Sequence, residues 1–267
     1  MKTDLEVHQV NTIRALALDA VKKANSGHSG TAMALAPLAH VLFTKILKYD
    51  SSNPDWHDRD RLVLSAGHAS MLLYAALHLT GYDLSLEDIK QFRQWNSITP
   101  GHPEAGMTPG VEVTTGPLGQ GLANAVGMAI AERNLRSRLG SELVDHFTYV
   151  IVGDGDLMEG ISHEAASLAG HQGLDRLIAI YDDNRITIDG PTGIAFSDDS
   201  AARFRSYGWH VEELGDISED LDALTSALER CKADTTRPSI VVVQSHIGFP
   251  APNAVDTPAA HGAITSE

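Results

Sequence analysis

Two apolar runs that flank an alanine-rich segment restrict the fold more than any other feature of this chain. The first run, residues 147–152, stops at Gly-Asp-Gly, and the second, residues 177–181, stops at Asp-Asp-Asn. A strand, a helix and a second strand in this order form a βαβ unit, whose strands are parallel and end at the same edge of a sheet. We therefore expect Asp154 and Asn184 to lie in neighbouring loops.

This strand edge has the composition of a site for a metal ion and a diphosphate. Asp154 and Asn184 offer side-chain oxygens, which are the ligands that a hard divalent cation prefers. The glycines on either side of Asp154 allow the backbone to approach phosphate oxygens closely. The segment predicts a divalent cation that carries a diphosphate group.

The rest of the chain continues the alternation of strands and helices. We expect further strands at residues 61–64, 209–214 and 240–245, and helices at residues 5–25, 32–47, 70–79, 120–138 and 218–232, with one more helix capped by Ser85 and Asp88. This order predicts an α/β fold with a doubly wound, mainly parallel sheet flanked by helices. No strong linker is visible, so we expect residues 1–267 to form a single domain with a helical N-terminal arm. Residues 246–267 show no clear periodicity.

Composition excludes several classes of protein. The net charge of −15 disfavours nucleic acid and anionic membranes as partners. A single cysteine, Cys231, excludes an internal disulfide. The sequence has no apolar run of membrane-spanning length, and the N-terminus does not resemble a signal peptide. We expect a cytoplasmic protein with a real hydrophobic core.

Histidine next to glycine is a recurring pair. Glycine precedes His28, His68, His102 and His171, and it follows His261. All of these except His171 fall in predicted loops, where glycine lets the backbone turn and leaves the imidazole at a cavity wall. A chain with 13 histidines produces some such pairs by chance, and His171 fits a structural role at the end of a helix.

Several blocks resemble the transketolase family, in the order in which that family has them. They are RALALDAVKKANSGHSG, ALAPLAHVLF, RDRLVLSAGHASMLLY, GHPE, TTGPLGQGLANAVGMAIAERNL, GDGDLMEGISHEAASLAG and YDDNRITIDG, and the match runs over residues 8–262. Gly-Asp-Gly with Asn about thirty residues later is similar to the cofactor signature of thiamine-diphosphate enzymes in general. The resemblance covers the N-terminal, diphosphate-binding (PP) domain of a transketolase.

The resemblance implies a set of cofactor ligands. Asp154, Asn184 and the backbone carbonyl of Ile186 would bind Mg²⁺, for which Ca²⁺ or Mn²⁺ can substitute. His68 and Gly155 would contact the diphosphate of thiamine diphosphate. The remaining cofactor contacts, along the aminopyrimidine and the thiazolium, would come from Gly116 and Leu118.

The resemblance also implies catalytic roles. His102 would approach the reacting carbon and the substrate hydroxyls, while His28 and His261 would flank the donor ketose and handle the proton of its C3 hydroxyl. Glu159 would join a glutamate network at a subunit interface, although a glutamate in the first turn of a helix is also favoured by the helix dipole alone. Imidazole suits proton transfer because its ordinary pKa lies near neutrality.

The chain departs from the family pattern on the substrate side. Ser29 stands where the family usually has proline, and we expect a freer loop with an added hydrogen-bonding group. A second glycine expected near Pro250 is missing. No pyrimidine-binding domain follows residue 267, so we expect a C-terminal transketolase subunit to supply it in an α2β2 complex.

We thus expect the N-terminal subunit of a transketolase that moves a two-carbon ketol unit from a ketose to an aldose, with sugars or sugar phosphates as substrates. An α-type subunit of a 2-oxo acid dehydrogenase shares the cofactor signature, but the Gly-His loops and TTGPLGQG argue against it. A catalytically silent, cofactor-binding scaffold is the other alternative; the histidines argue against it, whereas Ser29 keeps it open.

Overall fold

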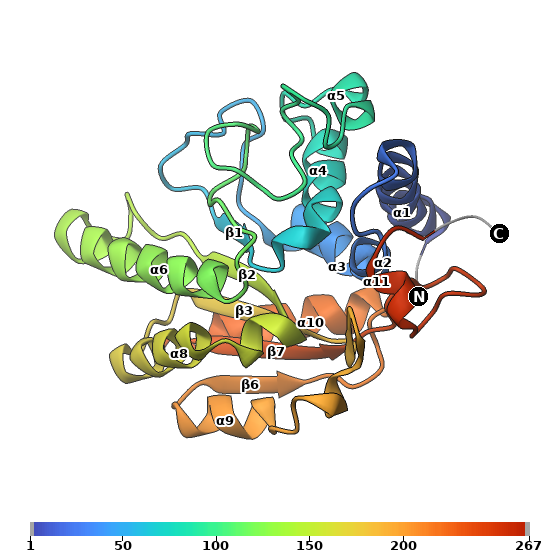
Figure 1. Ribbon diagram of the computed structural model, residues 1–267. Coiled ribbons are helices and arrows are strands. Elements are labelled where there is room, and N and C mark those ends of the chain that lie inside the picture. The colour runs from blue at the N-terminus through green and yellow to red at the C-terminus, as the bar shows by residue number, and fades with distance from the viewer. Residues whose placement is uncertain (1–2, 265–267) are drawn as a thin grey trace.

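A parallel sheet runs through the middle of the molecule (Figure 1). The computed structural model describes residues 3–264, and within them five parallel strands form this sheet in the order β1-β2-β3-β7-β6. The strands are β1 (Arg61–Leu64), β2 (Thr148–Gly153), β3 (Leu177–Asp183), β6 (His210–Glu213) and β7 (Ser239–Gln244). From β3 the chain passes to the edge strand β6 and then returns to β7, which lies between them, so the sheet is doubly wound as the sequence predicts.

Helices of very different length surround the sheet. They are α1 (Asp4–Ala24), α2 (Gly30–Ala34), α3 (Ala36–Val41), the π-helix η1 (Leu42–Ile46), the 3₁₀-helix η2 (Gly67–Ala69), α4 (Ser70–Leu79), α5 (Leu86–Lys90), α6 (Gln120–Leu139), α7 (Asp154–Met158), α8 (Gly160–Gln172), the 3₁₀-helix η3 (Thr192–Ile194), α9 (Ser200–Ser206), α10 (Leu221–Ala233) and α11 (Pro258–His261). A small antiparallel hairpin, β4 (Ile186–Thr187) with β5 (Gly190–Pro191), follows β3. None of the described helices is both long enough and apolar enough to cross a membrane.

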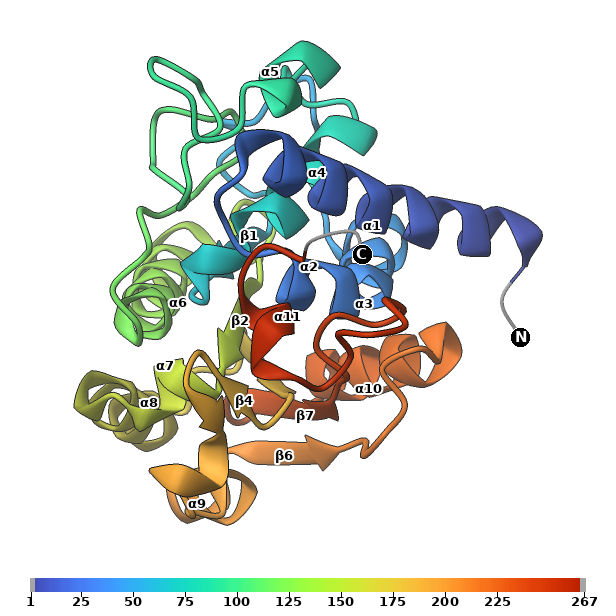
Figure 2. The same ribbon diagram turned by 45° about the vertical axis from the view of Figure 1, so that its right-hand side comes forward.

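Alternate strand residues build two separate cores. Tyr149 and Ile151 of β2 face the layer formed by α1, α3, α4 and α10. Val150 and Val152 of the same strand face α6, α8 and α9 on the other side (Figures 1 and 2). Both faces of the sheet are covered, which explains why its strands are almost continuously apolar rather than alternating in polarity.

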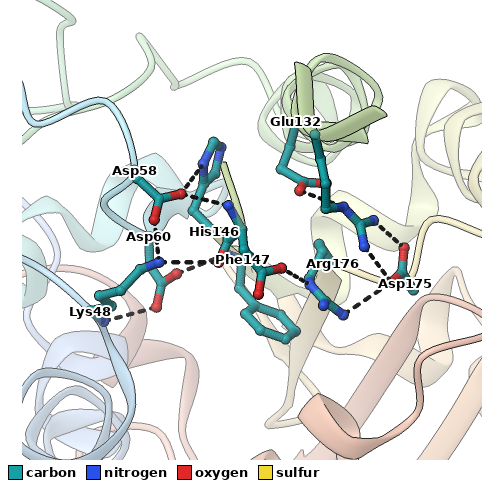
Figure 3. A network of polar contacts seen from close by, with 10 residues as sticks. Lys48, Asp58, Asp60, Glu132, His146, Phe147, Asp175 and Arg176 are labelled. Carbon is teal, nitrogen blue, oxygen red and sulfur yellow. Dashed lines mark hydrogen bonds and ion pairs between the residues drawn. The ribbon is translucent and has the colours of Figure 1, made fainter. Parts of the chain in front are cut away.

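Ion pairs close the edge of the sheet where the strands begin (Figure 3). Asp60 accepts hydrogen bonds from the backbone N–H groups of Lys48 and Phe147, each at 2.8 Å. Arg176, just before β3, pairs with Asp145 at 2.8 Å and with Asp175 at 3.0 Å. These contacts join the loops before β1, β2 and β3, and they leave the opposite edge free for a site.

The structure changes some of the predicted elements. The helix expected at residues 32–47 is divided into α2, α3 and η1, because Pro37 lies in the first turn of α3 and cannot continue a preceding helix. The helix expected from residue 218 begins at Leu221, after the N-cap Asp220. Several short elements were not expected at all, namely α7, α9, α11 and the hairpin of β4 and β5.

Candidate functional site

Every residue that the sequence singles out for cofactor, metal or catalysis lines one cavity. The cavity has a volume of about 430 Å³ and lies where β2 and β3 end. Its walls include His28, His68, His102, Gly116, Leu118, Asp154, Gly155, Glu159, Asn184, Ile186 and His261. His171 is not among the lining residues; it lies exposed in the last turn of α8. Segments from both ends of the chain and its middle therefore meet at one place.

Asp154 lies at the centre of the expected metal corner. The strand register pairs Gly153 with Asp182, so the ends of β2 and β3 are level, and Asp154 and Asn184 both reach the cavity. Asp154 is the first residue of α7 rather than a loop residue, which corrects the expected loop. The short helix was missed because five residues give no periodicity to recognise.

Two donors hold the Asp154 carboxylate. The Tyr181 hydroxyl donates to its Oδ1 at 2.6 Å, and the backbone N–H of Arg185 donates to its Oδ2 at 3.1 Å. Burial raises the pKa of Asp154 to about 6, because the charged form has lost water. A cation at this position would restore the balance of charge.

Asn184 is oriented by a neighbour that the sequence does not single out. Its side-chain N–H donates to Asp182 Oδ2 at 2.8 Å, while its Oδ1 accepts the backbone N–H of Ile186 at 3.0 Å. Asp182 is buried at the end of β3, and burial raises its pKa to about 7. Asp182 looks like an ordinary strand-end residue in the sequence, and only the fold reveals its contact with Asn184.

The oxygen atoms that the protein offers at this corner are too few to hold a metal ion without a second ligand. Within residues 3–264, no cluster of three or more His, Cys, Asp or Glu side chains is arranged to hold a metal ion. Asp154, Asn184 and the Ile186 carbonyl supply oxygens, and a hard cation needs at least six. Diphosphate oxygens together with water would complete that number, so these residues fit a metal bound with a diphosphate.

Asp156 joins three segments of the cavity wall and was also missed. Its fully buried carboxylate accepts the Ser65 hydroxyl at 2.6 Å, the Gly119 N–H at 2.8 Å and the Gly153 N–H at 2.9 Å. These donors belong to the loop after β1, the loop before α6 and the end of β2. Asp156 thus fixes the loop of Gly116 relative to α7, which begins at Asp154.

Glycine is required where the loops approach each other. A Cβ atom on Gly67 would lie 2.7 Å from Thr115 Oγ1 and 2.9 Å from the backbone N of Gly116. Gly116 itself has a φ of +149°, and a Cβ atom there would point at the His102 ring, 3.5 Å away. The backbone of the Gly116 loop is therefore exposed to the cavity beside His102.

Three imidazole rings form a triangle in the cavity. The ring centroids of His28 and His68 are 5.1 Å apart, those of His28 and His261 are 5.5 Å apart, and those of His68 and His261 are 5.0 Å apart. His68 belongs to η2 and His261 ends α11, so both lie on short helical turns rather than in the expected loops. His28 lies just before α2, in the predicted loop.

All four cavity histidines have lowered pKa values. Burial, assisted by the neighbouring His261, lowers the pKa of His28 to about 4 and that of His68 to about 3. Burial also lowers the pKa values of His102 and His261. The rings are neutral at pH 7, so each has one acceptor and one donor nitrogen. The Nδ1 atoms of His28 and His261 are buried and have no hydrogen-bond partner.

The loop of Ser29 is tied down, which contradicts the freer loop expected from the sequence. Ser29 is fully buried, and its N–H donates to the carbonyl of Gly262 at 3.2 Å. Its hydroxyl oxygen accepts the N–H of Ile264 at 3.2 Å. The expectation was wrong because it considered the loop alone, whereas the hydroxyl finds its partners in the C-terminal segment.

Comparison with known proteins identifies relatives of the whole described chain. The family model described as "Transketolase, thiamine diphosphate binding domain" matches residues 5–267. Among curated proteins, a transketolase from Nostoc sp. is 57% identical over 263 residues, which are 97% of this chain and 39% of that protein. The chain therefore spans about two fifths of the length of the relatives that it matches.

Solved structures give the same result. Transketolase from Leishmania mexicana superposes with a TM-score of 0.95 and 49% identity, and the match covers 98% of this chain and 39% of that one. Transketolase from Pichia stipitis, solved in complex with sedoheptulose-7-phosphate, superposes with a TM-score of 0.96 and 48% identity over 99% of this chain and 39% of that one. The doubly wound fold described above is the fold of these proteins.

Proposed function

This chain belongs to the transketolase family, and we propose that it forms the thiamine-diphosphate-binding part of an enzyme that transfers a two-carbon ketol unit from a ketose to an aldose. One observation carries the proposal: the eleven residues expected at the site all line a single cavity. The relatives favour this function over the α-subunit of a 2-oxo acid dehydrogenase. The presence of all four cavity histidines argues against a silent scaffold.

We infer that the cofactor binds with its diphosphate at the carboxyl edge of the sheet. Asp154, Asn184 and the Ile186 carbonyl would hold a divalent cation, for which Mg²⁺ is the natural choice because of its preference for oxygen ligands and phosphate. His68 and Gly155 would contact the diphosphate. The thiazolium ring of the bound cofactor supplies the electron sink that cleavage of the C2–C3 bond of a ketose requires.

The neutral histidines provide the proton transfers. The position of the His28 and His261 rings in the cavity wall supports a role in taking the proton from the C3 hydroxyl of the donor ketose. His102, beside the backbone of Gly116, would bind substrate hydroxyls. The lowered pKa values keep these rings neutral at pH 7, and burial makes a ring that has been protonated give up its proton readily, because the charged ring is poorly solvated.

Sugar phosphates are the proposed substrates. The Pichia stipitis transketolase binds sedoheptulose-7-phosphate, a ketose phosphate, in a structure that matches this chain at 48% identity. The described part of the cavity supplies histidines for the hydroxyl groups. Cations that bind the substrate phosphate would come largely from the remaining part of the enzyme.

We propose that residues 1–267 fold as one domain and that the rest of the enzyme corresponds to the three fifths of the relatives that this chain does not cover. The expected source is a C-terminal subunit with the pyrimidine-binding domain, in a complex of two copies of each chain. Glu159 lies exposed at the start of α8, beside the cavity, and would meet that subunit. A cytoplasmic location remains a prediction.

Calorimetry on single variants tests the cofactor assignment. Asp154→Ala removes the anionic ligand, and we expect Mg²⁺-dependent binding of thiamine diphosphate to weaken at least a hundredfold in the assembled enzyme, because diphosphate charge is then poorly balanced. Asp183→Ala is the matched control, since Asp183 is the carboxylate at the end of β3 that does not line the cavity. Unchanged affinity in Asp154→Ala would show that the metal lies elsewhere.

A further inference from the structure

The start of α2 and the end of α11 are held together by hydrogen bonds across 233 residues of sequence. The N–H of Ser29 donates to the Gly262 carbonyl at 3.2 Å, and the Ser29 hydroxyl lies 3.4 Å from the same oxygen. The N–H of Ile264 donates to the Ser29 hydroxyl at 3.2 Å. One serine therefore makes all three of these contacts with the C-terminal segment.

A close backbone approach reinforces this contact. A Cβ atom on Gly30 would lie 2.0 Å from the carbonyl oxygen of Ala260, so only glycine allows α11 to pack at this distance. The Gly30 carbonyl accepts the N–H of Gly248 at 3.0 Å. Figure 2 shows α11 packed beside α2. Ser29 and Gly30 thus both anchor the segment from Gly248 to Ile264.

These bonds lie immediately beside two cavity histidines. His28 precedes Ser29, and His261 precedes Gly262, so the bonded residues are the chain neighbours of both rings. The two rings face each other edge to face, with an interplanar angle of 84°. His261 has no hydrogen bond of its own at Nδ1 that could hold the ring in place. Its position is therefore set by the backbone on which it stands and by its ring contacts with His28 and His68.

We propose that Ser29 is a positioning residue that sets the distance between the His28 and His261 rings, and that the reaction depends on this contact. The placement of the rings rests only on the contacts described here, whereas the effect on turnover rests on the proposed function. Ser29 does not itself need to touch the substrate. It acts by holding the backbone of Gly262 against the start of α2.

Three substitutions separate the contributions of the hydroxyl and the N–H. Ser29→Ala removes the hydroxyl, leaves the Ile264 N–H without its acceptor and keeps the Ser29 N–H. Ser29→Pro removes the hydroxyl and the N–H, and it also pulls φ from −103° towards about −65°. Ser29→Thr retains both groups. The contact between residue 29 and the C-terminal segment should be weakened most by Ser29→Pro, less by Ser29→Ala and least by Ser29→Thr.

Histidine NMR titrations of the chain without cofactor provide the first readout. Burial lowers the pKa of His261 in the native chain, in a cluster where His28 and His68 are its ring neighbours and Arg93 adds positive charge near His28 and His102. If Ser29 holds the ring in the cavity, Ser29→Ala should move this pKa up towards 6.5, Ser29→Pro should move it further, and Ser29→Thr should leave it in place. Ser239→Ala, which removes another buried hydroxyl far from the cavity, is the matched control.

Steady-state kinetics of the assembled enzyme provide the second readout. Ser29→Ala should lower kcat/KM for the ketose roughly fivefold to tenfold, the effect of about one net hydrogen bond, while the KM for thiamine diphosphate stays unchanged. His261→Ala gives the upper limit of the effect. Loss of thermal stability with an unchanged His261 titration in both Ser29→Ala and Ser29→Pro would overturn the proposal, because it would reduce Ser29 to a structural role. The titration remains decisive even if the enzyme proves to have another activity.

Discussion

The imidazoles of His28, His68 and His261 meet without an acidic partner. Among the described residues, no carboxylate is hydrogen-bonded to any of the three rings, and their mutual contacts disfavour the charged form. This arrangement keeps the cluster neutral. An ordinary buried histidine pair would instead be satisfied by neighbouring groups.

The lowered histidine pKa values predict acid sensitivity of the fold. His68 has a folded pKa of about 3 against an ordinary value of about 6.5, so the unfolded chain binds the proton more readily. The titration of His68 therefore costs no stability above pH 6.5. As the pH drops from 6.5 towards 3, this one group lowers the free energy of unfolding by up to about 1.4 kcal/mol per pH unit. His68→Asn should flatten this decline in urea unfolding measured between pH 7.5 and pH 5.

The control for this experiment is His171→Asn, which removes an exposed histidine outside the cavity. It should follow the native chain at every pH. If His68→Asn and the native chain lose stability in parallel as the solution is acidified, the cluster does not stay neutral in the folded state.

Asp156 should be the carboxylate whose loss costs most stability. Asp156→Ala leaves the Gly119 and Gly153 N–H groups without their acceptor, and we expect the free energy of unfolding to fall by roughly 2–5 kcal/mol in urea titrations. Asp220→Ala also removes an acceptor of two N–H groups, but at an exposed helix N-cap, and should cost only about 1 kcal/mol. Equal losses in the two variants would show that Asp156 does not tie the three segments together.

At the scale of elements, the close packing of α11 on α2 brings His261 to the cavity wall. Gly30→Ala places a methyl group against the Ala260 carbonyl, and we expect a loss of about 1–3 kcal/mol together with faster amide exchange in α11. Gly127→Ala is the control, because its Cβ atom would meet nothing within 4 Å on the exposed face of α6. That change should be neutral or stabilising by up to about 1 kcal/mol. Unaltered exchange in α11 of Gly30→Ala would contradict the close packing.

The elements also show how far sequence reasoning reaches. Asp154 and Asn184 could be placed together because strands of a βαβ unit end at one edge, a rule that needs no tertiary detail. The convergence of His28 with His261 came only from the family resemblance, since no local pattern joins residues so far apart. The contacts of Ser29 and Asp182 were beyond reach because each depends on a partner brought in by the fold. Four-residue α11 is too short to show a period.

At the scale of the whole molecule, the two edges of the sheet differ in their charge pairing. At the edge where the strands begin, carboxylates such as Asp58 and Asp175 pair with lysine and arginine. At the cavity edge, Asp154, Asp156 and Asp182 are buried, and none of them forms an ion pair with a described residue. Unpaired buried charge costs stability unless a cation arrives. This asymmetry supports the proposal that a metal and its ligand bind at the cavity edge.

The most direct test of the proposed function is a ketol-transfer assay with the two parts of the enzyme mixed. This chain would be combined with the part of a transketolase that it does not cover, in the presence of Mg²⁺, thiamine diphosphate, a ketose phosphate donor and an aldose acceptor. We predict turnover only in the mixture, with loss of activity when Asp154→Ala replaces the native chain. Equal turnover by either part alone, or an active mixture containing Asp154→Ala, would contradict the proposal that this chain supplies the cofactor site.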